Sequence, residues 1–181
     1  MEEGIYKITD NFFLWIDEDK GDKLIYRRSI SEKPDIQEND IQILKIKEIE
    51  NNVNQAIQKY IRFLDIYNIK DIDNIKLFAF LLKVRLYREY ILRYFFNYML
   101  IDEYKQIIKD NTLTLAIAKY LSNKEPLSEK NKSIISNIDK FDKLYILFEN
   151  ATFGVPKSYI INLYNKFLDT LKAENISIQE S

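Results

Sequence analysis

The chain contains no cysteine and no histidine, and only three glycines and three prolines occur among its 181 residues. It therefore forms no disulfide, and it has no thiolate or imidazole to ligate a metal ion or to act in catalysis. Few glycines and prolines leave little of the turn chemistry that an all-β fold or a phosphate-binding loop requires. We expect a helical protein with no metal ion and no cofactor.

The sequence also lacks a run of about 20 apolar residues, the length that a membrane-spanning helix needs. Its most apolar stretch, residues 72–101, is interrupted by charged side chains, namely Lys76, Lys83, Arg85, Arg88, Glu89 and Arg93. The first ten residues, MEEGIYKITD, are acidic at the start and lack the apolar segment of a secretory signal. We therefore expect an intracellular, cytoplasmic protein that does not enter a membrane.

The overall composition is that of one folded domain. Hydrophobic residues make up 46% of the chain and charged residues 30%, and the formal net charge is −1. Such a balance does not indicate nucleic-acid binding. Abundant isoleucine, lysine, asparagine and tyrosine are typical of proteins from AT-rich genomes, including many archaeal and viral ones.

Residues 72–101 are apolar or aromatic around nearly the whole helical circumference, which predicts a central helix covered by neighbours on several sides. Asp71 or Asp73 is suited to cap its first turn. The fold class that we expect is mainly α, a bundle of five to six helices around this central helix, with an N-terminal β-hairpin.

The hairpin is predicted by two apolar runs, residues 12–16 and 24–26, on either side of a polar turn containing Gly21. An isolated hairpin is marginally stable and must lean on the helices or on a partner. We divide the chain into a hairpin (1–30), a linker (31–40), a helical domain (41–173) and a flexible tail (174–181). Ile41 and Ile43 fit either the start of the first helix or a third short strand.

Further helices follow from apolar residues at spacings of three and four. The first carries a heptad seam, made of Ile46, Ile49, Val53, Ala56, Tyr60, Phe63 and Tyr67. Asp110 and Thr112 indicate a kink or a new cap after the central helix. Ser128 is expected to cap another helix extending to Phe148, and a final helix is expected to begin at Pro156 or Ser158. The sequence leaves open whether the seam closes within one chain or between chains.

Enzyme signatures are missing. Asp17, Asp19, Gly21 and Asp22 resemble a calcium loop, but positions 6 and 12 from Asp17 hold Asp22 and Arg28 where an EF-hand needs glycine and glutamate. The phosphate-binding and nucleophile-elbow motifs do not occur. No spacing selects a carboxylate pair for acid–base catalysis. We therefore expect a protein that is not an enzyme.

The candidate binding residues of the hairpin are Phe12, Trp15, Tyr26, Arg27 and Arg28. Aromatic rings beside arginines are suited to stack bases or to anchor a protein interface, and they are equally suited to bury the hairpin against the helices. The first 50 residues carry 13 acids and 8 bases, a net charge of −5 that leaves +4 on the remainder. This asymmetry weakens the nucleic-acid alternative for the hairpin and favours a basic partner or docking within the chain.

The central helix adds Lys83, Arg85 and Arg88 as candidate binding residues. At 100° per residue its basic side chains spread over opposite sides of the helix, so they form no continuous stripe for a phosphate backbone. Either their stems cover apolar surface, or they pair with acids of neighbouring helices.

Residues 83–91, KVRLYREYI, resemble the basic helix in the helical domain of GINS subunits of the archaeal and eukaryotic replicative helicase complex. An N-terminal β element before a helical domain is also one of the two GINS domain orders. The resemblance covers about 30 residues, and this chain has only a hairpin where that family has a small β domain. It implies a non-enzymatic scaffold that assembles with sister subunits.

The function that we expect is therefore that of an interaction or scaffold protein, a subunit of a DNA replication complex or of another nucleic-acid-handling complex. It would contact a protein partner or a second copy of itself. The alternative is a nucleic-acid-binding accessory or regulatory protein of a virus or mobile element, acting through Arg27, Arg28, Lys83 and Arg85. An unrecognised carboxylate enzyme is the third hypothesis.

Overall fold

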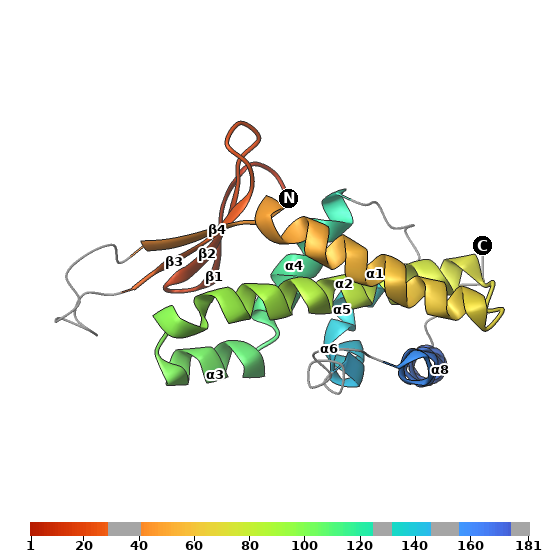
Figure 1. The fold of residues 1–181 in the computed structure, drawn as a ribbon. Helices are drawn as coiled ribbons and strands as arrows, with labels where there is room; N and C mark the ends of the chain where they lie inside the picture. The colour runs from red at the N-terminus through yellow and green to blue at the C-terminus, as the bar shows by residue number, and fades with distance from the viewer. Residues whose placement is uncertain (29–40, 125–131, 146–155, 175–181) are drawn as a thin grey trace.

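The computed structural model describes residues 1–28, 41–124, 132–145 and 156–174. An antiparallel sheet is followed by helices; α1 leads away from the sheet and α2 returns toward it alongside α1 (Figure 1). The strands are β1 (Gly4–Thr9), β2 (Phe12–Ile16), β3 (Lys23–Arg27) and β4 (Ile41–Lys45). The helical elements are α1 (Lys47–Ile66), α2 (Ile72–Phe95), η1 (Phe96–Tyr98), α3 (Ile101–Lys109), α4 (Thr112–Lys124), α5 (Ser133–Ser136), α6 (Ile138–Asp142), η2 (Lys143–Tyr145) and α8 (Lys157–Ala173).

The mainly α fold class around a long central helix is confirmed. Helix α2 is buried on several sides, and α1, α4, α6 and α8 pack around it. Most of the seam closes within the chain, because Ile49, Val53 and Phe63 are buried where α1 packs on α2 and α8, whereas Tyr67 at its end is exposed. No helix in the described part of the chain is long and apolar enough to span a membrane.

The central helix is shorter than expected. Asp71 caps its start, where the Asn74 N–H donates to the Asp71 carboxylate. The α-helix ends at Phe95, passes through the η1 turn, and reaches extended backbone at the buried Met99. Phe95 packs at the sheet, 5.0 Å from the Phe12 ring. No glycine or proline breaks the helix at this point, and the core continues past its end at Met99.

The N-terminal β element is a four-stranded antiparallel sheet in the order β1-β2-β3-β4, larger than the expected hairpin. Strands β2 and β3 are the predicted hairpin strands, and β1 and β4 pair with their outer edges. Ile41 and Ile43 lie in a strand, so the second of the two alternatives is correct and the first helix begins at Lys47. The expected linker, residues 31–40, lies outside the described residues.

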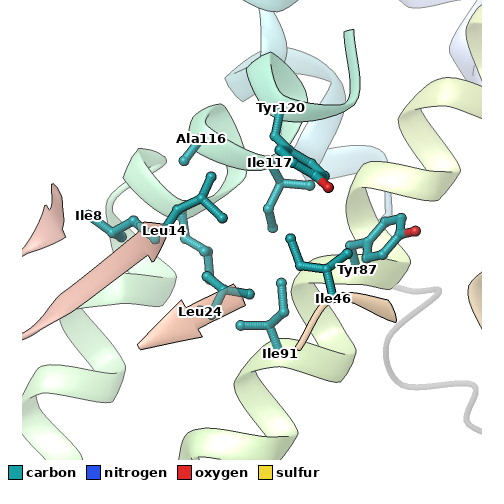
Figure 2. Close-up of a pocket in the computed structure, with 10 residues that line it drawn as sticks. Ile8, Leu14, Leu24, Ile46, Tyr87, Ile91, Ala116, Ile117 and Tyr120 are labelled. Atoms are coloured by element: carbon teal, nitrogen blue, oxygen red, sulfur yellow. The ribbon is translucent and has the colours of Figure 1, made fainter. Parts of the chain in front are cut away.

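The inner face of the sheet rests on α2 and α4. Figure 2 shows the junction, where strand residues Ile8, Leu14 and Leu24 face side chains of the two helices. The space left between them is about 10 Å³, which is at most the size of one water molecule. The sheet is therefore packed against the helices as part of the same core.

The later helical boundaries are partly as expected. Helix α3 ends at Lys109 and α4 begins at Thr112, which confirms the break near Asp110. Helix α8 begins at Lys157, directly after Pro156. Residues 132–145 form the short elements α5, α6 and η2 in place of one continuous helix. Ser128 and Phe148 lie outside the described residues.

Candidate interaction surface

The sheet has two chemically different faces, because successive side chains of a strand point to opposite sides. Phe12, Leu14, Leu24, Tyr26 and Leu44 point inward and are buried. The residues between them point outward, away from the core. The outward residues of the four strands are Ile5, Lys7, Phe13, Trp15, Lys23, Ile25, Arg27, Ile41, Ile43 and Lys45.

The strand register aligns these outward residues in rows across the sheet. One row runs Ile5, Trp15, Lys23, Lys45, and the next runs Lys7, Phe13, Ile25, Ile43. In the third, Arg27 lies opposite Ile41. Ile5, Ile41 and Ile43 are 62%, 49% and 44% exposed, and Phe13, Trp15 and Ile25 are partly exposed. We call these six apolar residues the outer band.

Trp15 lies within the outer band and is held by a cation. The Lys23 ammonium lies 4.3 Å from the centroid of the Trp15 ring, where the electron-rich face attracts it. Lys23 as a whole is buried, with 8% of its surface exposed. At the edge of the sheet, the Tyr94 hydroxyl of α2 donates to the Ile43 carbonyl over 3.0 Å. The band is thus built on ordered elements.

The charges on the outer face have one sign. Its outward strand positions carry Lys7, Lys23, Arg27 and Lys45, and within the described sheet none of these positions holds an acid. One counter-charge is Asp10, in the turn after β1, 2.5 Å from the Lys7 ammonium. The hydrogen bond and charge of Lys7 lower the pKa of the Asp10 carboxyl. Both side chains of this pair are exposed, so it is a weak interaction that a partner could displace.

The structure separates the five residues that the sequence grouped as a hairpin site. Phe12 and Tyr26 are 0% exposed and pack against Phe95, so they belong to the core and cannot touch a partner. Arg28 is also buried. Trp15 and Arg27 do lie on the outer face. The expected aromatic and arginine cluster is therefore wrong as a single surface, and the interpretation that rings anchor the β element to the helices holds for Phe12 and Tyr26.

The arginines of α2 are structural. Arg85 and Arg88 are each 2% exposed, and their guanidinium groups donate to the two carboxylate oxygens of Asp142 in α6, over 2.8 and 3.1 Å. Arg88 also donates to the Ile108 carbonyl at the end of α3. These bonds fasten α2 to α6 and α3. Placing Arg85 and Arg88 in a binding surface is thus wrong, and pairing with acids of other helices is the correct alternative.

Lys83 lines a polar cleft of about 260 Å³ between the β2–β3 turn, α1, α2 and α4. The cleft also contains Lys47, Glu50, Tyr120 and Lys124. Asp22 lies at its wall and accepts a hydrogen bond from the Tyr120 hydroxyl over 2.5 Å, with the Lys124 ammonium 3.3 Å away. Asp22 therefore joins the β2–β3 turn to α4, and the cleft carries both acidic and basic side chains.

The acidic turn between β2 and β3 is satisfied by its own backbone. The Asp17 carboxylate accepts from the N–H groups of Asp19 and Lys20, and the Asp22 carboxylate accepts from the Asp17 N–H. Gly21 adopts a positive φ of 89° and closes the turn with a bond to the Asp17 carbonyl. In the described residues, no three acidic side chains converge to hold a metal ion. The segment is a hairpin turn closed by a hydrogen bond between residues four positions apart, and Asp17, which the sequence placed in a solvated turn, is buried.

Sequence reasoning missed most of the outer band, including Phe13, Ile25 and Ile43. The two-residue period of strands contains the needed signal, because Phe12 and Trp15 are three positions apart in one strand and must point to opposite faces. Assigning Phe12 to the core would have placed Phe13 and Trp15 together on the other side.

Comparison with known proteins adds no neighbour from which a function could be carried over. The chain matches no protein-family model, no curated protein and no solved structure.

Proposed function

We propose that this chain is a non-enzymatic interaction protein that binds a partner protein through the outer face of its sheet. The observation that carries the proposal is the outer band, six apolar side chains that adjoin across all four strands and stay partly or largely exposed. Isolated exposed apolar residues are ordinary, but a contiguous group on one rigid face is typical of an interaction site. Aromatic side chains such as Phe13 and Trp15 are enriched at such interfaces and often anchor them.

The charged residues of the interior support a scaffold in preference to a catalyst. Arg85, Arg88 and Asp142 bond to one another in the core, and Asp22 is bonded to Tyr120 and Lys124. These groups hold helices and turns in place. Catalysis by carboxylates would need two acids in one cleft with pKa values shifted apart. Asp22 and Glu50 line one cleft, but Asp22 is engaged by Tyr120 and Lys124. The lack of cysteine and histidine agrees with the same conclusion.

A second candidate function is binding of single-stranded nucleic acid on the same face. It is favoured by the rings of Phe13 and Trp15 next to Lys7 and Lys23, since bases stack on aromatic side chains beside basic ones. Against it, the remaining four members of the band are isoleucines, which have no ring on which a base can stack. We therefore place protein binding first.

Photo-crosslinking tests the proposed function. A benzophenone side chain would replace Phe13 or Ile43 in the outer band, and Lys59 on the exposed face of α1 as the control position. After irradiation in a lysate of the cells that make the protein, we expect a protein adduct at the two sheet positions that survives nuclease and is missing at Lys59. Adducts of equal yield at all three positions, or an adduct that nuclease removes, would refute the proposal.

Membership of a DNA replication complex is the specific form of this proposal that the resemblance of residues 83–91 implies. Arg85 and Arg88 of that segment are bonded to Asp142, so partner contacts would have to come from elsewhere on the chain. Light scattering at low and high salt, combined with identification of the crosslinked partner, tests it. A stoichiometric helicase-complex subunit would support membership, and a partner of another class would exclude it.

A further inference from the structure

The outer band runs diagonally across the sheet. It begins with Ile5 and Trp15 in the first row, continues through Phe13, Ile25 and Ile43 in the second, and ends at Ile41. The basic residues fill the corners that the diagonal leaves free. Lys23 and Lys45 lie on one side of the band, and Lys7 and Arg27 lie on the other. An apolar stripe is thus flanked by positive charge on both sides.

We propose that the occupant of the outer band is an amphipathic helix of a partner protein, with acidic residues on both borders of its apolar stripe. This inference rests on the proposed function and names the chemistry of its partner. With strands about 4.8 Å apart and about 3.3 Å per residue, the band is roughly 20 Å from corner to corner. A helix with a rise of about 1.5 Å per residue covers this length in roughly 13 residues, or between three and four turns.

Charge complementarity selects this occupant over the others. The outward strand positions carry only basic charges, so this face favours an acidic partner and not the basic partner that the net charge of the first 50 residues indicated. Acidic residues on the two borders of the bound helix would lie opposite Lys45 on one side of the stripe and Arg27 on the other. Their attraction to these two residues would fix the orientation of the helix. A second copy of this chain, docking through the same face, would place lysine and arginine against lysine and arginine. A nucleic-acid strand would satisfy the charges but would leave the isoleucines against a polar backbone.

The only tryptophan of the chain is Trp15, so intrinsic fluorescence reports on the band directly. The probes are three designed helical peptides of about 15 residues without tryptophan. The first has a leucine stripe bordered by glutamates, the second has the same stripe bordered by lysines, and the third has the glutamates but alanine in the stripe. A thymidine oligonucleotide is the fourth probe. Calorimetry measures each affinity, and Trp15 emission locates the binding.

We expect the first peptide to bind and to shift Trp15 emission to shorter wavelength. It should bind about tenfold more tightly than the lysine-bordered peptide, because several exposed ion pairs of modest strength act together. The third peptide should not shift the emission. The double variant Lys45→Glu/Arg27→Glu, with one change on each side of the band, should reverse the preference between the first two peptides. The matched control Lys59→Glu/Lys119→Glu has the same change in net charge on exposed helical positions and should leave the preference unchanged.

The other outcomes separate this inference from the proposed function. Equal binding of the glutamate- and lysine-bordered peptides would overturn the acidic partner while leaving the face as a protein-binding surface. Failure of all three peptides, together with a protein adduct in the crosslinking experiment, would overturn the helical acidic partner alone. Failure of the peptides without an adduct would overturn both. Salt-sensitive binding of the oligonucleotide with a change in Trp15 emission would assign the face to nucleic acid.

Discussion

Removing the negative charge of Asp142 should strongly destabilise the fold. Asp142→Asn keeps the shape of the side chain but removes the charge that Arg85 and Arg88 share at 2.8 and 3.1 Å. Breaking a buried ion pair by changing one partner costs about 3–5 kcal/mol, because the remaining charge stays in the interior. We expect a value near the lower end, about 3 kcal/mol, since Asp142 is 14% exposed and Arg88 keeps its bond to the Ile108 carbonyl.

Urea unfolding measures this cost. With an m-value of about 2–3 kcal/mol/M, the midpoint should fall by roughly 1–1.5 M while the slope stays unchanged. Asp139→Asn is the matched control, because Asp139 lies in the same helix but is exposed, and it should change the free energy of unfolding by less than about 0.5 kcal/mol.

A double-mutant cycle with Arg85→Met tests the physical reason for the loss. The coupling between Asp142 and Arg85 should be at least about 1 kcal/mol, as expected for charged neighbours that share a hydrogen bond. The reasoning would be refuted if Asp142→Asn cost less than about 1 kcal/mol, or if the two substitutions were additive.

Three further predictions concern the sheet and its junction with α4. Leu44→Ala should cost about 2–4 kcal/mol of unfolding free energy and Ile43→Ala below about 1 kcal/mol. Leu44 lies on the inner face of β4 and Ile43 on its outer face. Equal costs in urea denaturation would contradict this assignment of faces. Tyr120→Phe should cost about 1.5–2 kcal/mol at neutral pH by removing the bond to the Asp22 carboxylate. Burial raises the pKa of Asp22, but the bonds from Tyr120, the Asp17 N–H and Lys124 together lower it below its ordinary 3.8. The stability that the Asp22 carboxylate confers is therefore present above pH 3.8 and is lost as the pH falls through its lower pKa in the folded state. Urea titration at several pH values should show that the difference in unfolding free energy between wild type and Tyr120→Phe shrinks in acid. Gly21→Ala should lower the free energy of unfolding by about 1 kcal/mol through backbone strain alone, because φ is positive and no atom lies within 4 Å of the added methyl group. An unchanged thermal midpoint would refute this reasoning.

The helical part of the fold was the more predictable from sequence. The continuous apolar circumference of residues 72–101 identified the central helix, and the spacing of Ile49 and Val53 identified the buried seam of α1. Helical periods repeat over many residues, so a few exceptions do not obscure them. The end of α2 at Phe95 was missed, because no glycine or proline within residues 72–101 marks it.

Strand β1 was missed for a related reason. Its six residues contain Ile5 on the outer face and Ile8 on the inner face, so apolar residues do not alternate with polar ones. The same two-sided pattern in β2 concealed the candidate surface. An outer face that itself carries apolar side chains removes the contrast by which a sequence distinguishes inside from outside.

The buried pairing of Arg85 with Asp142 was out of reach as a specific prediction. The two residues are 57 positions apart and meet only when α6 packs on α2. The sequence supported the class of explanation, a basic side chain paired with an acid of another helix, but several acids were available. Only the packed structure selects one of them.

The order of the strands has a consequence for the newly made chain. Each strand pairs with its neighbour in sequence, so the backbone of the sheet is complete once residue 45 has been synthesised. Its inner side chains stay uncovered until Ile91 and Phe95 of α2 and Ile117 of α4 have been added. Through that interval both sides of the sheet are apolar and open to solvent. An acidic helix already present in the cell could occupy the outer side during synthesis, so assembly with a partner and folding of this chain would be concurrent events.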